Sequence, residues 1–194
     1  MRTQLRIVAG SLRGRRLVCT VAPGLRPTPD MVRQALFSIL GNAVPGRTFF
    51  DLFAGTGAVG FEALSRGAER VVFIERDNKT AAEISRHVTE FGVADRVDVE
   101  RADVYRWADR WDAPAEPVNL FLGPPYPDYR ERLEAFLGLV ALLQAKAAEG
   151  SVVVVQGEQT FAFDRLPGGD VWDQRKYGRN WLLFWVKEPP APPP

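Results

Sequence analysis

The sequence predicts an α/β fold, a doubly wound and mostly parallel sheet preceded by a β-hairpin extension. From residue 48 onward, strongly apolar strand segments alternate with helical segments, which indicates a parallel sheet covered by helices on both faces. A glycine-rich segment joins the first of these strands to its helix. The last two strands follow one another without a helix, so the sheet is expected to end in an antiparallel hairpin.

The N-terminal residues predict a hairpin and then a helix. Residues 5–9 and 15–21 are two short apolar strands on either side of a turn at residues 10–14. Thr28 is a favourable N-cap, and the proline after it suits the first helical position. A helix with one apolar stripe is therefore expected over residues 29–40.

The repeating strand and helix units follow. Strands are expected at residues 48–53, 70–75, 96–101, 118–123, 151–156, 170–176 and 181–187. Helices are expected after the glycine-rich segment through residue 65, near residues 78–91 and 129–145, with a short helical segment after residue 101.

Three parts of the chain differ in composition. Residues 1–26 are predicted to form the basic hairpin extension and residues 27–188 the α/β domain. Residues 189–194 are rich in proline and are expected to be an extended, disordered tail. A chain of 194 residues is long enough for one domain with a substantial core.

The bulk composition excludes several classes of protein. With 46% hydrophobic and 25% charged residues, the chain is neither disordered nor membranous, and no apolar run approaches the roughly 20 residues that span a bilayer. The single cysteine, Cys19, cannot form an internal disulfide and is expected to be buried, so a cytoplasmic location is expected. No Cys/His cluster suggests a metal site, and a monomer is the default expectation.

Charge is distributed unevenly along the chain. Residues 1–50 contain eight arginines, no lysine and one acid, Asp30, a balance of +7 within a chain whose net charge is +1. Such a separation indicates that a polyanion meets the N-terminal part, although a solvated basic surface is the alternative. The exclusive use of arginine favours phosphate binding, because the planar guanidinium can hold a phosphate by two hydrogen bonds.

The glycine-rich segment, residues 51–60, reads DLFAGTGAVG. Gly55 and Gly57 allow a tight turn and close approach of the backbone to a ligand at the carboxyl edge of the sheet. The same spacing occurs in dinucleotide-binding proteins and is a weak signal alone. Asp51 argues against a dinucleotide, because a carboxylate at this position suits the amino group of a methionine moiety and not a pyrophosphate.

Two further acids follow successive strands. Glu75 ends the second strand of the domain, where a carboxylate can accept hydrogen bonds from ribose hydroxyls. Asp103 follows the third strand, where it can accept a hydrogen bond from an adenine amino group. Each alone could be an exposed loop carboxylate, but three acids at three strand ends favour a nucleoside ligand.

Several aromatic side chains have competing interpretations. His87, the only histidine, is expected to be a surface or partly buried residue of a helix rather than a general base. Trp107 and Trp111 are expected to pack against the sheet rather than to stack on nucleic acid.

The segment DLFAGTGAVGFEALSRGA (51–68) resembles motif I of the class I S-adenosylmethionine-dependent methyltransferases, which have a Rossmann-like fold. Five more segments extend the resemblance: RIVAGSLRGRRL (6–17), RPTPDMVRQALFSIL (26–40), FIERD (73–77), PPY (124–126) and KYG (176–178). Together they are similar to the family that methylates guanine N2 in bacterial 16S ribosomal RNA. The arginine-rich hairpin is the discriminating part, because generic methyltransferases lack it.

The resemblance implies a seven-stranded sheet, S-adenosylmethionine as the methyl donor, and 16S ribosomal RNA in a partly assembled small ribosomal subunit as the partner. It implies that the cofactor is held by Asp51, Phe53, Ala54, Gly55, Thr56 and Gly57 at the methionine part, Glu75 and Arg76 at the ribose, and Ala102, Asp103 and Val104 at the adenine. RNA contacts are expected at Arg6, Arg13, Arg15, Arg16, Arg26, Arg33, Lys176 and Arg179.

One motif departs from the family pattern. The fourth strand of this family usually ends in Asp-Pro-Pro-Tyr or Asp-Pro-Pro-Phe, and this chain has Gly123-Pro124-Pro125-Tyr126. In the family the aspartate and the first proline carbonyl accept hydrogen bonds from the guanine amino group, and the aromatic ring stacks on the flipped base.

The glycine leaves three interpretations open. The backbone carbonyl and a water can suffice, another carboxylate such as Asp128 can reach in, or the chain binds cofactor and RNA without catalysis. A dinucleotide-dependent oxidoreductase is disfavoured, because nothing in the sequence supplies a nicotinamide site.

Overall fold

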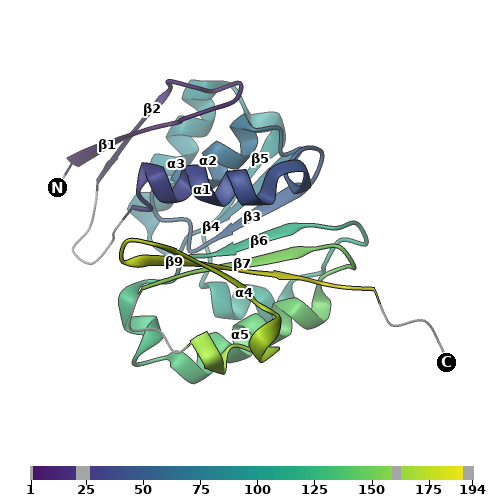
Figure 1. Cartoon of the computed structure of the whole chain (residues 1–194). Coiled ribbons are helices and arrows are strands. Elements are labelled where there is room, and N and C mark those ends of the chain that lie inside the picture. The colour runs from purple at the N-terminus through teal and green to yellow at the C-terminus, as the bar shows by residue number, and fades with distance from the viewer. Residues whose placement is uncertain (1, 21–26, 159–162, 190–194) are drawn as a thin grey trace.

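A computed structural model of the chain describes residues 2–20, 27–158 and 163–189. Figure 1 shows a three-layered α/β body with a separate hairpin at its N-terminal end. The strands are β1 (Arg2–Arg6), β2 (Arg16–Thr20), β3 (Thr48–Leu52), β4 (Arg70–Ile74), β5 (Val97–Glu100), β6 (Asn119–Leu122), β7 (Val152–Glu158), β8 (Asp173–Tyr177) and β9 (Asn180–Val186). The α-helices are α1 (Asp30–Leu40), α2 (Ala58–Ser65), α3 (Asn78–Phe91), α4 (Val104–Arg110) and α5 (Leu133–Lys146).

The large sheet has seven strands in the order β5-β4-β3-β6-β7-β9-β8. Strands β3 to β7 run parallel to one another, whereas β9 is antiparallel to both β7 and β8. The predicted seven-stranded sheet with an antiparallel end is therefore confirmed. Successive strands leave β3 in one direction and β6 in the other, which creates a crevice between these two strands where open α/β sheets bind ligands.

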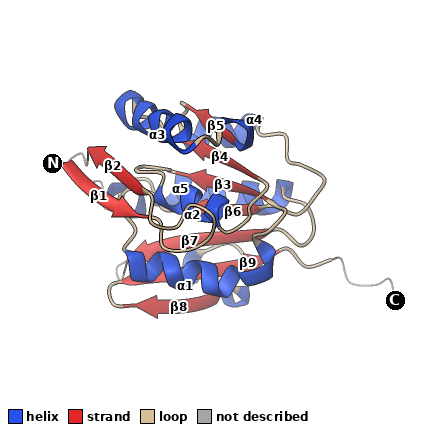
Figure 2. Ribbon diagram, turned by 90° about the horizontal axis from the view of Figure 1, so that it is seen from above, coloured by secondary structure: helices blue, strands red, loops and turns tan. Residues whose placement is uncertain are grey.

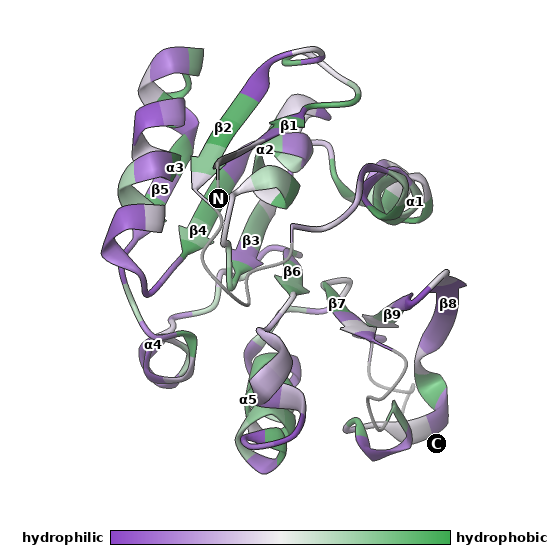
Figure 3. Ribbon diagram, turned by 90° about the vertical axis from the view of Figure 1, so that its left-hand side faces the viewer, coloured by the Kyte–Doolittle hydropathy of each residue, from purple (hydrophilic) through white to green (hydrophobic). Residues whose placement is uncertain are grey.

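Helices cover both faces of this sheet and divide the core into two halves. Helices α1, α2 and α3 pack on one face, and α4 and α5 on the other (Figure 1). The buried residues of β4 are all apolar and those of β3 are apolar except for Asp51, whereas the edge strand β8 is strongly hydrophilic (Figure 3). Charged side chains on an edge strand disfavour pairing with another sheet, so the edge at β8 is protected from aggregation.

The hairpin of β1 and β2 forms a separate antiparallel sheet that docks on α2 and α3. The first strand ends at Arg6, earlier than predicted, because the N–H groups of Val8 and Ala9 donate to the Glu62 carboxylate of α2 instead of to a strand. On the other side, Glu83 of α3 accepts a hydrogen bond from the backbone N–H of Thr20 at 2.8 Å. Figure 2 shows the hairpin on the side toward which the arrowheads of the parallel strands point.

Other details differ from the predictions. Helix α1 begins at Asp30 without a side-chain cap, because the N-cap position is Pro29 rather than Thr28, and the Thr28 hydroxyl donates to Gln156 of β7 at 2.8 Å. The helix expected from residue 129 starts later, at Leu133, because a 3-10 helix, η3 (Tyr126–Tyr129), precedes it. His87 is fully buried rather than at the surface, and its ring contacts Glu90 and the Val18 carbonyl.

Two expectations about packing are confirmed. Cys19 is buried, and its thiol lies 3.8 Å from the Thr56 carbonyl in the glycine-rich loop, with its pKa raised to about 11, mainly by burial. Trp107 and Trp111 both pack their rings against Phe50 of β3. None of the helices in the described ranges has the length and hydrophobicity needed to cross a bilayer.

Candidate active site

A cavity of about 660 Å³ opens at the carboxyl ends of β3, β4, β6 and β7. It brings together most of the residues that the sequence predicts for cofactor binding and catalysis, and one of those predicted to contact RNA, Arg179. Those that line it are Asp51, Phe53, Ala54, Gly55, Thr56, Glu75, Arg76, Asp103, Val104, Gly123, Pro124, Pro125, Tyr126 and Arg179. The expected cofactor residues Gly57 and Ala102 and the expected RNA-binding Lys176 are not among its lining residues.

The glycine-rich loop needs left-handed backbone at three positions. Gly55 and Gly57 have φ values of +52° and +73°, and Gly57 precedes the first residue of α2. Phe53 also has a positive φ, +68°, which is costly for a residue with a side chain. Strain of this kind is concentrated at functional sites, and the Phe53 ring both lines the cavity and meets Tyr105 edge-on at 5.9 Å.

Gly60 has a different role from the other two glycines. Its N–H donates to Asp51 Oδ2 at 2.9 Å. A Cβ atom on Gly60 would lie 2.2 Å from Phe73 Cε1 and 2.9 Å from Val71 Cγ1 of β4. The missing side chain therefore lets α2 lie against the sheet, which keeps the turn of the loop narrow.

Asp51 is a buried carboxyl group at the floor of the cavity. Its side chain is 1% exposed, and burial raises its pKa to about 8, with the Gly60 N–H lowering it and the nearby Glu75 raising it further. Burial disfavours the ionised form unless a cation is close. An ammonium group in the cavity would restore the charge of Asp51, so this carboxyl is suited to bind one.

The other two strand-end acids are already bonded to backbone. Glu75 accepts the N–H of Gly55 on Oε2 and that of Asp77 on Oε1, each at 2.8 Å. Asp103 caps α4, with Oδ1 accepting from the N–H groups of Tyr105 and Arg106. A carboxylate oxygen can accept more than one hydrogen bond, so both acids are oriented by the protein and retain acceptor capacity for a ligand.

The Gly-Pro-Pro-Tyr segment follows β6 and lies at the mouth of the cavity. Pro124 is buried, and Tyr126 is 38% exposed, with the Arg130 guanidinium 5.1 Å from its ring centre. The Pro125 carbonyl accepts the Asp128 N–H at 2.9 Å. No backbone donor among the described residues bonds to the Pro124 carbonyl, which remains available to a ligand.

Four further residues line the cavity: Tyr105, Asp128, Arg132 and Gln156. From the sequence, only Asp128 is named, as one of three alternatives, and the other three are not predicted. Tyr105 donates its hydroxyl to Asp128 Oδ2 at 2.6 Å, and the Arg132 guanidinium lies 4.1 Å from the Tyr105 ring centre. Burial and the Asp128 carboxylate both raise the pKa of Tyr105, which therefore remains a hydroxyl donor. Gln156 lies near the end of β7 at the same edge. Proximity to motif positions and strand ends is the only sequence signal for these residues.

The basic residues divide into three groups. Arg6, Arg13, Arg15 and Arg16 are exposed on the hairpin, and Arg179 is exposed at the rim of the cavity. Lys176 is exposed, with its ammonium 5.5 Å from the Trp181 ring centre.

Two of the expected RNA-binding arginines are not in these positions. Arg33 does not lie at the surface: it is 1% exposed, and its guanidinium donates to the carbonyls of Thr28 and Arg6. This expectation is corrected, because a buried guanidinium that joins α1 to the hairpin cannot also grip an external phosphate. Arg26 lies outside the described residues.

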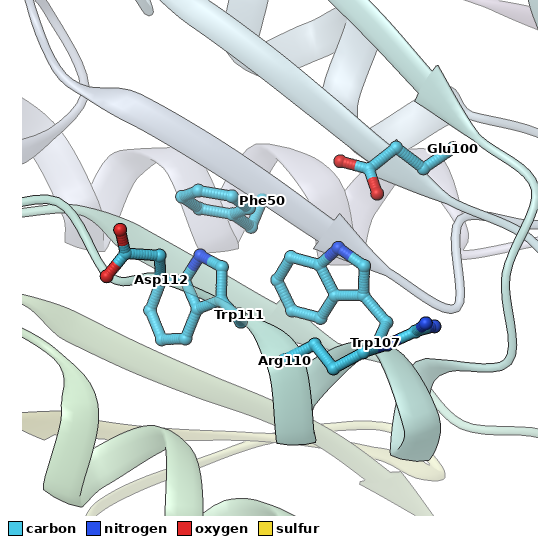
Figure 4. A pocket seen from close by; sticks show the side chains of 6 residues that line it. All are labelled: Phe50, Glu100, Trp107, Arg110, Trp111 and Asp112. Carbon is cyan, nitrogen blue, oxygen red and sulfur yellow. The ribbon is translucent and has the colours of Figure 1, made fainter.

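A second cavity lies between α4 and the other face of the sheet. Figure 4 shows it lined by Phe50, Glu100, Trp107, Arg110, Trp111 and Asp112. The two indole rings stack at 5.6 Å and cover Phe50, so the aromatic residues there serve packing. Within the described ranges, no group of three or more His, Cys, Asp and Glu side chains is arranged to hold a metal ion.

Comparison with known proteins finds one matching family, relatives named as ribosomal RNA methyltransferases and a similar solved structure. The family described as "Conserved hypothetical protein 95" matches residues 5–186. The Bacillus subtilis protein "Putative rRNA methyltransferase YlbH" is 34% identical over 187 residues, 94% of this chain and 99% of that protein. "Ribosomal RNA small subunit methyltransferase D" of Haemophilus influenzae is 36% identical over 129 residues, 63% of this chain and 64% of that protein. The solved structure of "Putative methyltransferase yhhF from Escherichia coli" is 28% identical with a TM-score of 0.77, covering 96% of this chain and 99% of that chain.

Proposed function

The chain belongs to the conserved hypothetical protein 95 family, and we propose that it transfers a methyl group from S-adenosylmethionine to the N2 amino group of a guanine in 16S ribosomal RNA. Relatives named as ribosomal RNA methyltransferases support the reaction class. The proposed substrate is a partly assembled small ribosomal subunit in the cytoplasm, and the proposed active form is a monomer.

The single observation that carries the proposal is that one cavity contains both a nucleoside-binding set and the Pro-Pro-Tyr segment. The cofactor half has a buried carboxyl at Asp51 for the methionine ammonium, Glu75 for the ribose and Asp103 for the adenine. The donor set fits S-adenosylmethionine, because its acids are placed for a cation and for hydroxyl and amino donors. When bound, this cofactor supplies an electrophilic methyl group on a sulfonium.

The substrate half contains the groups that a guanine needs. Tyr126 is exposed enough to stack on a flipped base, and the proline pair fixes the backbone so that the Pro124 carbonyl can accept a hydrogen bond from N2. That hydrogen bond draws electron density toward nitrogen, which is otherwise a poor nucleophile because its lone pair is delocalised. The exposed arginines of the hairpin would bind RNA phosphates, and the turn that carries Arg13 packs against Ser65 at the C-terminal end of α2.

The test is transfer of labelled methyl groups from S-adenosylmethionine to small subunits isolated from cells that lack this modification. Label in guanine N2 with the native chain, and its loss in Tyr126→Ala, would support the proposal. Binding of S-adenosylhomocysteine should be unchanged in Tyr126→Ala, because the ring belongs to the substrate half.

A specific observation also favours a second candidate, a cofactor- and RNA-binding protein without catalysis. Gly123 provides no carboxylate where the family usually has one. A Cβ at Gly123 would lie 3.3 Å from Phe121 Cε1, so Gly123→Asp requires only a small shift. Label only from Gly123→Asp would support this second candidate and contradict the first.

A further inference from the structure

The proposed methyl transfer needs a second hydrogen-bond acceptor beside the guanine amino group. The amino group has two N–H bonds, and the Pro124 carbonyl can accept one. Gly123 has no side chain to accept the other. A side-chain acceptor would therefore come from elsewhere in the same cavity, and a carboxylate is the strongest acceptor that side chains offer.

Most carboxylates of the cavity have other bonds. Asp51 accepts the Gly60 N–H, Glu75 accepts the N–H groups of Gly55 and Asp77, and Asp103 caps α4. All three lie at the ends of strands β3, β4 and β5, in the cofactor half. Asp77 caps α3 by accepting the Thr80 N–H at 2.9 Å. These acids are fixed by the fold in the cofactor half. Glu158 also lines the cavity, but it ends β7 and does not follow the Pro-Pro-Tyr segment in the chain.

Asp128 is beside that segment. It lies in η3, lines the cavity, and is 4% exposed. Its N–H donates to the Pro125 carbonyl at 2.9 Å, so the carboxylate is held one turn away from the proline pair. A buried carboxylate needs hydrogen-bond partners, and at this position a substrate can be one of them.

The arrangement of its partners leaves one oxygen for a ligand. The Tyr105 hydroxyl donates to Asp128 Oδ2 at 2.6 Å, and the Tyr105 ring is held between Arg132 and Phe53. Within the described part of the chain no donor bonds to Oδ1 of Asp128. The Tyr105 hydroxyl thus fixes the orientation of the carboxylate, which makes Tyr105 a positioning residue.

We propose that Asp128 is the catalytic acceptor that replaces the missing aspartate at position 123, by binding the second N–H of the guanine amino group and then taking its proton. This inference rests on the proposed function. As the N2 lone pair forms a bond to the methyl carbon, the carbon–sulfur bond breaks with its electron pair going to sulfur. The methylated nitrogen is then cationic, and its proton passes to Asp128 Oδ1 and from there to solvent.

The decisive variant is Asp128→Asn, measured with Gly123→Asp and the double variant. The amide oxygen of the asparagine can still accept the Tyr105 hydroxyl, but its NH₂ group replaces the free acceptor with a donor. We expect kcat to fall by about 10²-fold, as when a charge-stabilising group is lost, with dissociation constants for S-adenosylhomocysteine and RNA within about twofold of the native values. Adding Gly123→Asp to Asp128→Asn should restore most of the lost rate.

Tyr105→Phe is the matched control, because it removes the hydroxyl and keeps the ring. If Asp128 only anchors Tyr105, Asp128→Asn should keep nearly native activity, because its amide oxygen still accepts the Tyr105 hydroxyl, and Tyr105→Phe should be the slow variant. That result would overturn the proposal, as would a slow Asp128→Asn that Gly123→Asp does not rescue. A native chain without methyl transfer would instead overturn the proposed function, and the Asp128 assignment with it.

Discussion

The Glu62 carboxylate of α2 accepts the backbone N–H of Val8 at 2.8 Å, and this contact joins the basic hairpin to the helix that follows the glycine-rich loop. Glu62 is fully buried, and its other oxygen accepts the Ala9 N–H and the Arg66 side chain. Two N–H groups of the hairpin therefore attach it to this carboxylate, and Arg66, at the C-terminal end of α2, pairs with the same group from the body. Cys19, from the second strand of the hairpin, lies against the glycine-rich loop itself.

The Glu62→Gln variant tests this attachment. The amide keeps one acceptor and turns a donor toward a backbone N–H, which leaves a buried group unsatisfied. We expect a loss of about 1–3 kcal/mol in the free energy of unfolding and faster amide exchange at Val8 and Ala9. RNA affinity should fall more than affinity for S-adenosylhomocysteine. The exposed Glu69→Gln is the control and should change stability by less than about 0.5 kcal/mol; equal effects of the two variants would contradict the role of Glu62.

Gly60 and Gly138 allow a matched test of helix packing. A Cβ at Gly60 meets Phe73 at 2.2 Å, whereas Gly138 is exposed in α5, and a Cβ there would meet nothing within 4 Å. Gly60→Ala should destabilise the protein by about 1–3 kcal/mol or more through overpacking. Gly138→Ala should stabilise it by up to about 1 kcal/mol, because alanine has the higher helix propensity. Chemical denaturation of both variants measures the difference, and a neutral Gly60→Ala would show that α2 can shift without cost.

The order of strands and helices, and the residues of the glycine-rich loop, could be predicted because they depend on local periodicity and turn chemistry. The burial of Arg33 could not, because helical spacing placed it on α1 without showing that the hairpin carbonyl of Arg6 would lie against it. The strained φ of Phe53 had no sequence signal, since glycine is the usual residue in that conformation. The contact between Tyr105 and Asp128 joins residues 23 positions apart, and only the packing of α4 beside η3 brings them together.

The exposed hairpin arginines should control the salt dependence of RNA binding. Replacing both Arg13 and Arg16 with alanine should lower the slope of log affinity against log salt by about 1–2, because each phosphate contact contributes slightly less than one unit. Arg70→Ala is the control, since Arg70 is also exposed but lies outside the hairpin, at the start of β4, and pairs with Asp98. An unchanged slope in the double variant would remove the hairpin from the RNA-binding surface. Filter binding at several salt concentrations makes the comparison.

The raised pKa of Asp51 predicts that cofactor binding is linked to proton release. With a pKa of about 8, Asp51 is mostly protonated at pH 7 in the free protein, and a nearby ammonium favours the ionised form. Binding of S-adenosylhomocysteine should release a proton, and its affinity should rise by up to about tenfold per pH unit between roughly pH 6 and 7.5, below the pKa of the ligand's own amino group. Calorimetry in buffers of different ionisation enthalpy measures the proton directly.

The raised pKa of Asp51 also affects the stability of the free protein, which should fall with rising pH where cofactor affinity should rise. Because the folded pKa of Asp51 is about 8 and its ordinary value is 3.8, the folded state binds the proton more tightly between these values. This carboxyl therefore lowers the free energy of unfolding as pH rises from about 4 to about 8. In Asp51→Asn this contribution should disappear, and ligand binding should release no proton from this site and be weaker at pH 7.5. A native protein that releases no proton on binding would place the ammonium of the cofactor away from Asp51. An unchanged pH profile of stability in Asp51→Asn would contradict the raised pKa of Asp51 itself.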